Sequence, residues 1–208
     1  MKVAVIGTGK MGSGLASALV AAGHETFIGA RDLNKADALA KQIGQGAQSG
    51  SVATAAKSAE TIVLALPYAS IKEVIAQAGD LTGKVIIDIT NPVSADYKEL
   101  TVGLTTSAAE EIQKLAPGAK VVKAFNTIFS SLLSSEVRKG KKLQVFIAGD
   151  NSIAKRTVAD IAESIGFEPV ESGPLSNSRF IEPVGEMNIH FAFFLGKGTV
   201  VAPAWVQL

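Results

Sequence analysis

The chain has 208 residues, of which 47% are hydrophobic and 19% are charged, and its formal net charge is +1. That is enough apolar material for the core of one globular domain, and the near-neutral charge without a long basic run disfavours nucleic acid as a partner. Because the sequence has no cysteine and only two histidines, it excludes disulfides and thiol chemistry and predicts no metal site.

The first segment of the chain predicts a nucleotide-binding unit. Apolar patterning indicates a strand at residues 2–6, a helix at 11–22 and a second strand at 26–28. The turn between the first strand and the helix reads Gly7-Thr8-Gly9-Lys10-Met11-Gly12, which is the G-x-G-x-x-G pattern. The pattern alone is weak, but inside a complete strand–turn–helix–strand unit it predicts a dinucleotide site.

Each glycine of this turn has a distinct physical role. Gly7 permits the tight turn, Gly9 removes the Cβ that would block a pyrophosphate, and Gly12 lets the helix pack close to the strand. The N-terminus of the helix then offers free N–H groups and the positive end of its dipole to the phosphates.

The end of the second strand indicates which dinucleotide binds. The acid that holds the ribose 2′-OH in an NAD site would fall near Gly29 or Ala30, and neither can serve. Arg31 follows at once and Lys35 comes four residues later, so two cations can meet a 2′-phosphate. We therefore expect NADP rather than NAD, although both cations could also belong to a solvated helix end. Asp32 could turn to the ribose, but we expect it to cap the next helix.

The remaining chain alternates helices and strands, which predicts crossover connections and a mainly parallel sheet of about eight strands. Further helices are predicted at residues 33–43, 51–57, 70–78, 107–115 and 152–165, and a short helix or helical turn is predicted at 130–136. Further strands are predicted at residues 60–66, 85–89, 120–124, 143–148 and 167–170, with a short one possible at 47–48. Residues 94–104 indicate a surface loop, and the basic run at 138–142 indicates a solvated loop. The expected fold class is therefore α/β, with a Rossmann-type, doubly wound, mainly parallel sheet.

The tail of the chain departs from this alternation. Residues 182–196 form the most apolar helix candidate, hydrophobic around most of its circumference, which predicts burial against its own domain or a partner. We therefore expect an NADP-binding Rossmann domain at residues 1–175 and a C-terminal helical appendage at 176–208 that completes the acceptor cleft. Because such a short appendage cannot easily close a substrate cleft, we also expect a homodimer.

Residues that follow three buried strands should meet at the carboxyl edge of the sheet, where ligands bind in open α/β folds. Leu66 and Pro67 end one strand, and Asn91 and Asn126 follow the next two. The asparagines could bind the carboxamide or ribose hydroxyls of a nicotinamide nucleotide, or they could simply cap strand ends and turns.

A proton donor for an alcohol or imine substrate is harder to identify. His190 lies within the apolar helix, where a core histidine is expected, His24 lies on the wrong edge of the sheet, and Tyr68 stands alone. We therefore predict no catalytic side chain. Hydride transfer between a nicotinamide and a second planar redox ring fits this absence, because such transfer needs mainly stacking and alignment.

Five stretches carry a family resemblance that covers nearly the whole chain. They are the glycine turn, Ala30-Arg31 with Lys35, Ala65-Leu66-Pro67, Asp88-Ile89-Thr90-Asn91-Pro92 and Val122-Lys123-Ala124-Phe125-Asn126-Thr127. With these stretches the chain resembles the NADPH-dependent deazaflavin (coenzyme F420) reductase family. The oxidoreductase domain of the transmembrane ferric reductases is a related branch.

The resemblance implies NADP as cofactor and a deazaflavin or flavin as second substrate. It implies that Thr8, Ala30, Arg31 and Lys35 hold the 2′-phosphate side of NADP, and that residues 9–11 hold the pyrophosphate. It also implies that the deazaflavin lies over the nicotinamide, in a cleft partly walled by the C-terminal segment, here residues 195–201.

Three functions stay open on the sequence alone. The first is an NADPH-dependent oxidoreductase that passes hydride to or from a deazaflavin or flavin. The second is a reductase of a small carbonyl or imine, in which Glu186 or His190 would have to reach the nicotinamide. The third is an NADP-sensing module without turnover. We expect a cytoplasmic protein without a membrane partner, because no apolar run approaches ~18 residues and the N-terminus is already a strand.

Overall fold

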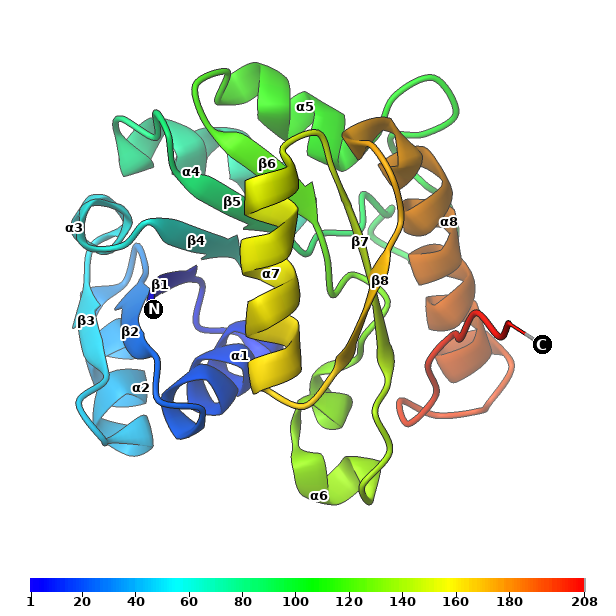
Figure 1. Ribbon diagram of the computed structural model, residues 1–208, viewed down its shortest axis with the longest axis horizontal. Helices are drawn as coiled ribbons and strands as arrows, with labels where there is room; N and C mark the ends of the chain where they lie inside the picture. The colour runs from blue at the N-terminus through cyan, green and yellow to red at the C-terminus, as the bar shows by residue number, and fades with distance from the viewer. Residues whose placement is uncertain (208) are drawn as a thin grey trace.

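The apolar runs of the sequence form the strands of one eight-stranded sheet in the computed structural model, which describes residues 1–207 (Figure 1). The strands are β1 Lys2–Ile6, β2 Glu25–Gly29, β3 Gln48–Gly50, β4 Thr61–Leu64, β5 Val85–Asp88, β6 Lys120–Lys123, β7 Gln144–Gly149 and β8 Glu168–Glu171. Their order in the sheet is β3-β2-β1-β4-β5-β6-β7-β8. All neighbouring pairs are parallel except β6 and β7, so the predicted mainly parallel sheet is confirmed.

Helices cover both faces of this sheet. They are α1 Lys10–Ala21, α2 Leu33–Ile43, α3 Val52–Ser58, α4 Ile71–Ala78, α5 Ala108–Leu115, α6 Ser135–Arg138, α7 Ser152–Ser164 and α8 Ser178–Ile189. A π-helical turn at His190–Phe194 continues α8. Within residues 1–207, none of the helices combines the length and the apolarity that crossing a bilayer requires.

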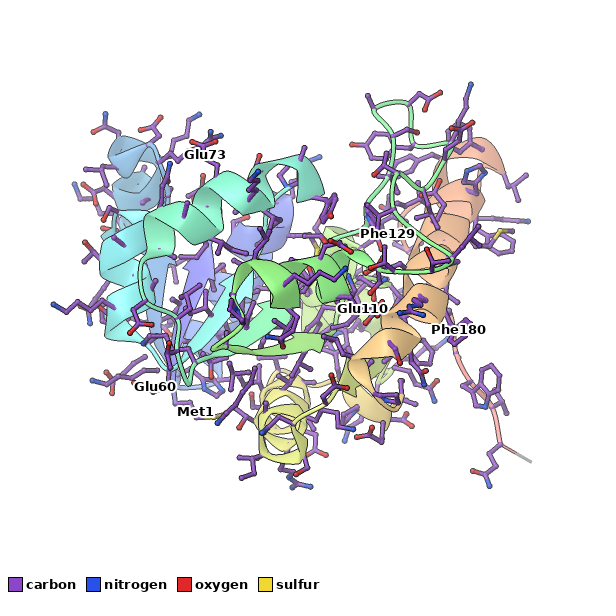
Figure 2. The ribbon with its side chains drawn as sticks, turned by 90° about the horizontal axis from the view of Figure 1, so that it is seen from above. Met1, Glu60, Glu73, Glu110, Phe129 and Phe180 are labelled. Atoms are coloured by element: carbon purple, nitrogen blue, oxygen red, sulfur yellow. The ribbon has the colours of Figure 1, made fainter. Side chains whose placement is uncertain are left out.

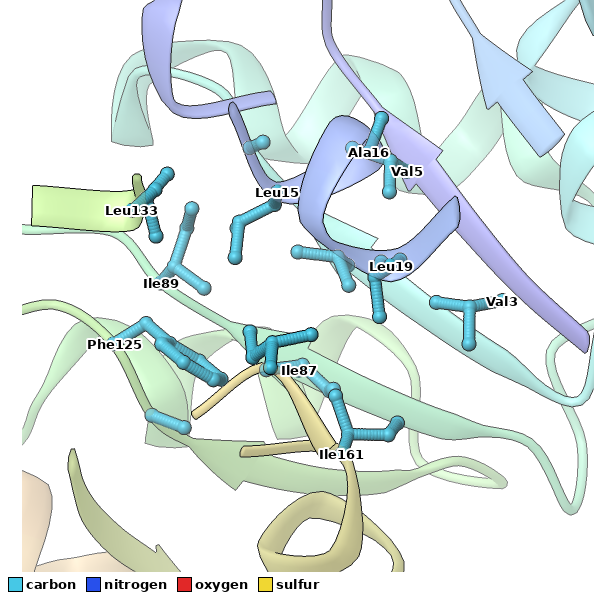
Figure 3. Packing of buried hydrophobic residues seen from close by; sticks show 14 of the residues in the cluster. Val3, Val5, Leu15, Ala16, Leu19, Ile87, Ile89, Phe125, Leu133 and Ile161 are labelled. Atoms are coloured by element: carbon cyan, nitrogen blue, oxygen red, sulfur yellow. The ribbon is translucent and has the colours of Figure 1, made fainter. Parts of the chain in front are cut away.

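The side-chain alternation of the strands explains the two-sided arrangement. On β1, Val3 and Val5 pack into one buried cluster with α1, α2 and α7, whereas Ala4 and Ile6 pack into another with α3, α4 and α5. Because successive residues of a strand point to opposite faces, a strand that is apolar throughout must be covered on both sides. Figure 3 shows the first cluster, in which Leu15 and Leu19 of α1 lie over Ile87 of β5.

The sheet topology also positions the glycine turn. From β1 the chain first adds β2 and β3 on one side, and then crosses over to add β4, β5 and β6 on the other. The crevice at such a reversal, outside the carboxyl ends of the strands, is where ligands bind in open α/β folds. The turn that follows β1 lies at this reversal.

One local prediction is refined and one is corrected. Residues 130–136, expected to be a short helix or helical turn, form a 3₁₀ turn, Ser130–Leu133, followed by the separate short helix α6. The basic run is not fully solvated, because Arg138 is buried. Its guanidinium donates hydrogen bonds to the carbonyls of Ile165 and Gly166 and lies 4.1 Å from the ring centroid of Phe167. Arg138 thus satisfies carbonyls at the C-terminal end of α7.

The C-terminal helix is the largest departure from expectation. It begins at Ser178, four residues earlier than predicted, and carries Pro183 within it. The sequence predicted burial of this helix against its own domain or a partner, but its buried side carries Glu182, Glu186 and Asn188, while many of its apolar side chains are exposed. The described residues therefore do not bury this helix on all sides, and specific polar contacts hold it to the domain.

Candidate functional site

The glycine turn after β1 combines tight packing with one open position. Gly7 has a φ of +122°, and a Cβ there would lie 2.2 Å from the carbonyl oxygen of Ala65. A Cβ on Gly12 would lie 2.1 Å from the carbonyl oxygen of Gly7. A Cβ on Gly9, by contrast, would meet nothing within 4 Å. Gly7 and Gly12 are thus required by the fold, whereas the space beside Gly9 is free for a ligand.

The N-terminus of α1 is prepared for an anion. Its N-cap residue is Gly9, which has no side chain to accept from the first N–H groups, and the first turn contains no acidic residue. Helices α2, α3, α5 and α7 are instead capped by the side chains of Asp32, Ser51, Ser107 and Asn151. The first N–H groups of α1 are therefore available to a phosphate group, and the helix dipole favours negative charge there.

A small cavity of about 160 Å³ lies on the β2 side of the turn. Its lining includes Gly7, Thr8, Ala30, Arg31, Asp32, Lys35 and Leu66. A groove of about 450 Å³ adjoins it and shares Ala30 and Arg31 with it. The two hollows lie next to each other between the ends of β1 and β2 and the start of α3, a suitable place for the adenosine half of a dinucleotide.

The cations of this cavity are available to a ligand. Arg31 Nη1 lies 3.3 Å from Oε2 of Glu73, but both side chains are more than half exposed, so the ion pair is weak and easily exchanged. Asp32 Oδ1 accepts hydrogen bonds from the backbone N–H groups of Asn34 and Lys35 at 3.1 and 3.3 Å. Asp32 therefore caps α2 as predicted, and its carboxylate is engaged by the helix.

A second cavity, of about 600 Å³, lies on the other side of the turn, between the ends of β5 and β6 and helix α8. Most of its lining is apolar, with a few polar groups, as is typical of small-molecule sites. The lining residues are Met11, Ile89, Asn91, Tyr97, Phe125, Asn126, Thr127, Ile128, Phe129, Ser130, Gly185, Asn188, Ile189, Phe193 and Phe194.

The two asparagines of this cavity bind each other. Asn91 Nδ2 donates to the carbonyl oxygen of Asn126 at 2.8 Å, and Asn126 Nδ2 donates to Asn91 Oδ1 at 2.9 Å and to the carbonyl oxygen of Ile181 at 3.1 Å. Oδ1 of Asn126 and Oγ1 of Thr127 are buried and have no hydrogen-bond partner within the described residues. These two atoms can therefore take polar groups of a ligand, because leaving them unpaired is costly.

The backbone turns sharply where these polar groups begin. Phe125 has a φ of +57°, which is rare for a bulky residue, and its side chain is almost fully buried. Its ring packs edge-on against Phe167 at a centroid distance of 5.7 Å. Local strain of this kind persists where the surroundings hold it, and here it ends β6 and directs the chain to Asn126 and Thr127.

Helix α8 approaches this edge of the sheet through a glycine. A Cβ on Gly185 would lie 2.4 Å from Oδ1 of Asn91 and 2.7 Å from Nδ2 of Asn126. Any larger residue would thus displace the asparagine pair. Gly185 allows α8 to form one wall of the 600 Å³ cavity.

A buried ionic network anchors α8 beside the cavity. Lys123 Nζ lies 2.6 Å from Oδ2 of Asp88 and 2.8 Å from Oε1 of Glu182, and it donates to the carbonyl oxygen of Thr90 at 2.8 Å. Glu182 also accepts from the N–H groups of Ala108 and Ala109 at the N-terminus of α5, at 2.9 and 3.2 Å. Burial alone would lower the pKa of Lys123, but the two carboxylates outweigh it and raise the pKa above its ordinary value. The lysine is therefore a cation that joins β5, β6 and α8.

The candidate acid–base residues lie outside the cavity lining. Oε1 of Glu186 is 3.3 Å from Nε2 of His190, and burial raises the pKa of the Glu186 carboxyl while His190 offsets this in part. His190 is about one third exposed, so it is not the core histidine that the sequence predicts. His24 Nε2 lies 2.9 Å from Oγ of Ser164, and Tyr68 packs against the cluster of α3, α4 and α5.

The residues predicted from sequence fall into three groups. Gly7, Thr8, Ala30, Arg31, Lys35 and Leu66 line the 160 Å³ cavity, and Met11, Asn91 and Asn126 line the larger cavity. Gly9, Lys10 and Gly12 lie on the turn and first helical turn, and Pro67 precedes a 3₁₀ turn, so none of these four lines either cavity. Ligand contact by all of them stays a prediction.

Several residues that shape the site were not predicted from sequence. Lys123 follows the apolar pair Val121-Val122 at the end of a buried strand, and Gly185 lies within an apolar helix candidate, so the residue type at each of these two positions could have indicated a special role. No feature of the sequence indicated the positive φ of Phe125. The C-terminal wall of the larger cavity comes from Gly185, Asn188, Ile189, Phe193 and Phe194, and not from residues 195–201 as the resemblance implied. The last residue of the predicted appendage, Leu208, lies outside the described residues.

Comparisons with known proteins agree with this geometry. Residues 2–92 match the family model of the coenzyme F420-dependent NADP oxidoreductases. The chain is 34% identical to the F420-dependent NADP reductase of Methanothermobacter thermautotrophicus, over 91% of this chain and 88% of that protein. It is 32% identical to the metalloreductase STEAP3 of Rattus norvegicus over 88% of this chain, but it spans only 36% of that longer protein.

A solved structure shares the fold over nearly its whole length. It is the crystal structure of a protein from Arthrobacter sp. FB24 that is provisionally assigned as an F420-dependent NADP reductase. The TM-score is 0.87 at 32% sequence identity, and the match covers 96% of each chain.

Proposed function

Because the chain belongs to the family of F420-dependent NADP reductases and is therefore an NADP-dependent oxidoreductase, we propose that it transfers a hydride between NADP(H) and a deazaflavin of the F420 type. A flavin is the alternative acceptor. When bound, NADPH supplies a hydride from its nicotinamide ring, and the acceptor takes up that hydride together with one proton from solvent. In the reverse direction, the reduced acceptor would return the hydride to NADP and release the proton to solvent.

The chemistry of the larger cavity carries this proposal. Its lining contains no carboxylate, histidine, lysine or arginine, and Tyr97 is its one titratable side chain. A carbonyl or imine substrate needs a proton donor beside the hydride path, whereas a planar redox ring needs mainly alignment. Glu186 and His190, the donors that the carbonyl alternative requires, are absent from the lining.

The residues present fit NADP at several points. The space beside Gly9 and the free N–H groups of α1 suit the pyrophosphate. Arg31 and Lys35 suit the 2′-phosphate, since a guanidinium and an ammonium both bind phosphate oxygens. Asn126 Oδ1, buried and unpaired, can accept a hydrogen bond from the carboxamide of the nicotinamide.

The apolar side chains of the larger cavity would serve the transfer itself. Met11, Phe193 and Phe194 line the cavity without being buried and offer flat or flexible apolar surface against which rings can be held. Exclusion of water by such a lining strengthens the polar contacts that orient the nicotinamide. The protein would thus orient the nicotinamide and the acceptor ring, and the hydride transfer itself would take place between the two rings.

The test is an acceptor panel. Purified protein is mixed with NADPH, and the loss of NADPH absorbance is followed with F420, FMN, FAD and a set of ketones and imines in turn. We expect turnover with F420 that exceeds turnover with any carbonyl or imine. Turnover confined to the ketones or imines would contradict the proposal, and tight NADPH binding without turnover in any mixture would favour a sensing module.

Replacement of Arg31 by alanine tests the 2′-phosphate assignment. We expect the affinity for NADPH to fall by about 1.5–3 kcal/mol, the range for a lost hydrogen bond to a charged group, and the affinity for NADH to change little. Calorimetric titration with both nucleotides measures the difference. Lys2→Ala is the matched control, because Lys2 forms a similarly exposed ion pair with Glu25 at the other end of β1. Equal weakening of both nucleotides would refute the assignment.

A further inference from the structure

Glu73 binds the arginine that borders both hollows beside the glycine turn. It lies in the first turn of α4, and its Oε2 is 3.3 Å from Nη1 of Arg31. Arg31 lines the 160 Å³ cavity and also the 450 Å³ groove next to it. Val74 of α4 lines the cavity and Gln77 lines the groove, so this helix forms a wall of both. Figure 2 shows the labelled Glu73 at the surface of the molecule. The carboxylate thus meets Arg31 at an edge that a ligand can reach.

The carboxylate of Glu73 occupies a position on Arg31 that a phosphate group would need. A guanidinium binds carboxylate and phosphate oxygens alike through its N–H groups, so a 2′-phosphate has to replace the carboxylate or share the guanidinium with it. The other oxygen of Glu73, Oε1, accepts a hydrogen bond from Nε2 of Gln77 at 3.0 Å. The carboxylate therefore keeps a partner beside the site when Arg31 turns to a ligand.

The second acidic residue of this region, Asp32, has a different role. Its Oδ2 lies 3.8 Å from Nζ of Lys35, but its Oδ1 accepts hydrogen bonds from backbone N–H groups at the start of α2. The helix that Asp32 caps thus offsets its charge. Within the described residues, the hydrogen bonds of Glu73 come only from the side chains of Arg31 and Gln77. Glu73 is therefore the acid whose charge acts directly against a 2′-phosphate.

The two nicotinamide nucleotides should affect this ion pair differently. A phosphate monoester carries a charge of about −1.5 to −2 at pH 7, so the 2′-phosphate of NADPH would attract Arg31 and be repelled by Glu73. NADH has an uncharged hydroxyl at this position and would leave the ion pair intact. Carboxylates accept hydrogen bonds from the ribose hydroxyl in NAD sites, and Glu73 brings such a group from α4, whereas Gly29 and Ala30 at the end of β2 offer none.

We propose that Glu73 competes with the 2′-phosphate for Arg31 and thereby limits the preference of the site for NADP over NAD. The inference rests on the proposed function, because it takes Arg31 as the residue that binds the 2′-phosphate. The side chains of Glu73 and Arg31 are both more than half exposed, so the competition is modest and amounts to a factor of about five. Glu73 is thus a specificity-determining residue that takes no part in hydride transfer.

Replacement of Glu73 by glutamine removes the charge and keeps the length of the side chain. We expect Glu73→Gln to bind NADPH about fivefold more tightly, and NADH equally or more weakly, in calorimetric titrations with each nucleotide. The gain for NADPH should shrink at about 0.5 M salt, because salt screens exposed charges. Glu25→Gln is the matched control, since Glu25 forms a similarly exposed ion pair with Lys2 at the other end of β2. It should leave both affinities unchanged.

The variant Arg31→Ala separates this inference from the proposed function. In that background Glu73→Gln should gain little, because no guanidinium is left to compete for. The full fivefold gain there would show that Glu73 acts by charge alone and would overturn the competition. If Arg31→Ala weakens NADPH binding while Glu73→Gln leaves it unchanged, or tightens both nucleotides equally, the inference fails and the 2′-phosphate assignment stands. Unchanged NADPH affinity in Arg31→Ala would overturn both.

Discussion

Replacement of Lys123 by methionine is expected to lower the free energy of unfolding by about 3–5 kcal/mol, the cost of breaking a buried ion pair by removing one partner. Methionine has a similar length, so the loss comes from charge and not from a cavity. Asp88 and Glu182 would then share a site without their cation, and both are almost fully buried. Urea denaturation measures the change, and a loss below about 1 kcal/mol would contradict the role given to the network.

Two further variants distinguish the loss of this buried ionic network from the unspecific effect of replacing a lysine of this strand by methionine. Lys120→Met, at the start of the same strand, is the control, because Lys120 does not take part in the network. Addition of Glu182→Gln to Lys123→Met should recover part of the loss, since only one of the two carboxylates then stays charged. Losses that simply add would show that Lys123 and Glu182 are not coupled.

The pH dependence of this effect follows from the pKa of Lys123. Since that pKa is raised in the folded chain, the contribution of the lysine is fully present below the ordinary pKa of about 10.4 and is lost as the pH rises through the folded value. The difference in unfolding free energy between wild type and Lys123→Met should therefore be constant from pH 8 to pH 10. It should shrink only at higher pH.

Replacement of Gly9 by alanine is expected to weaken NADPH binding by at least about 100-fold, about 2.7 kcal/mol, while the unfolding free energy changes by less than about 1 kcal/mol. The methyl group meets no protein atom within 4 Å, and the φ of −73° at Gly9 suits any residue. It would instead occupy the space that the pyrophosphate needs. Calorimetric titration with NADPH and urea denaturation measure the two quantities.

Gly12→Ala is the matched comparison within the same turn. Its methyl group would lie 2.1 Å from the carbonyl oxygen of Gly7, so we expect a loss of about 1–3 kcal/mol in unfolding free energy from overpacking. The contrast between a stable variant that binds poorly and a destabilised variant identifies Gly9 as the ligand-facing glycine. Unchanged NADPH affinity in Gly9→Ala would place the pyrophosphate elsewhere.

Much of the fold could be predicted because its determinants are local. Continuous apolar runs became strands covered on both faces, and α2 begins and ends at the predicted residues, Leu33 and Ile43. Asp32 precedes that helix and caps it, as its residue type predicts. The glycine turn after β1 is likewise a short-range feature, so its position at the reversal of the sheet followed from strand order alone.

The small cavity beside the glycine turn was predictable for the same reason. Thr8, Ala30, Arg31 and Lys35 lie within 28 consecutive residues, in one strand–turn–helix–strand segment and the first turn of the helix that follows it, and they meet at one cavity. The larger cavity is different, because its walls come from β5, β6 and α8, which lie far apart in the chain. No periodicity in the sequence links Asp88 to Lys123 or to Glu182.

The sequence by itself determined the α/β architecture, the glycine turn and the two cations beside it, because each depends on neighbours within a few residues. Only the tertiary structure decided which side of α8 faces inward. A helix with apolar residues around most of its circumference has no preferred face, so long-range ionic and hydrogen-bond partners orient it. Lys123 and the N-terminus of α5 hold Glu182, and Arg179 binds Glu110, which turns many apolar side chains of α8 outward. That orientation creates the wall of the larger cavity.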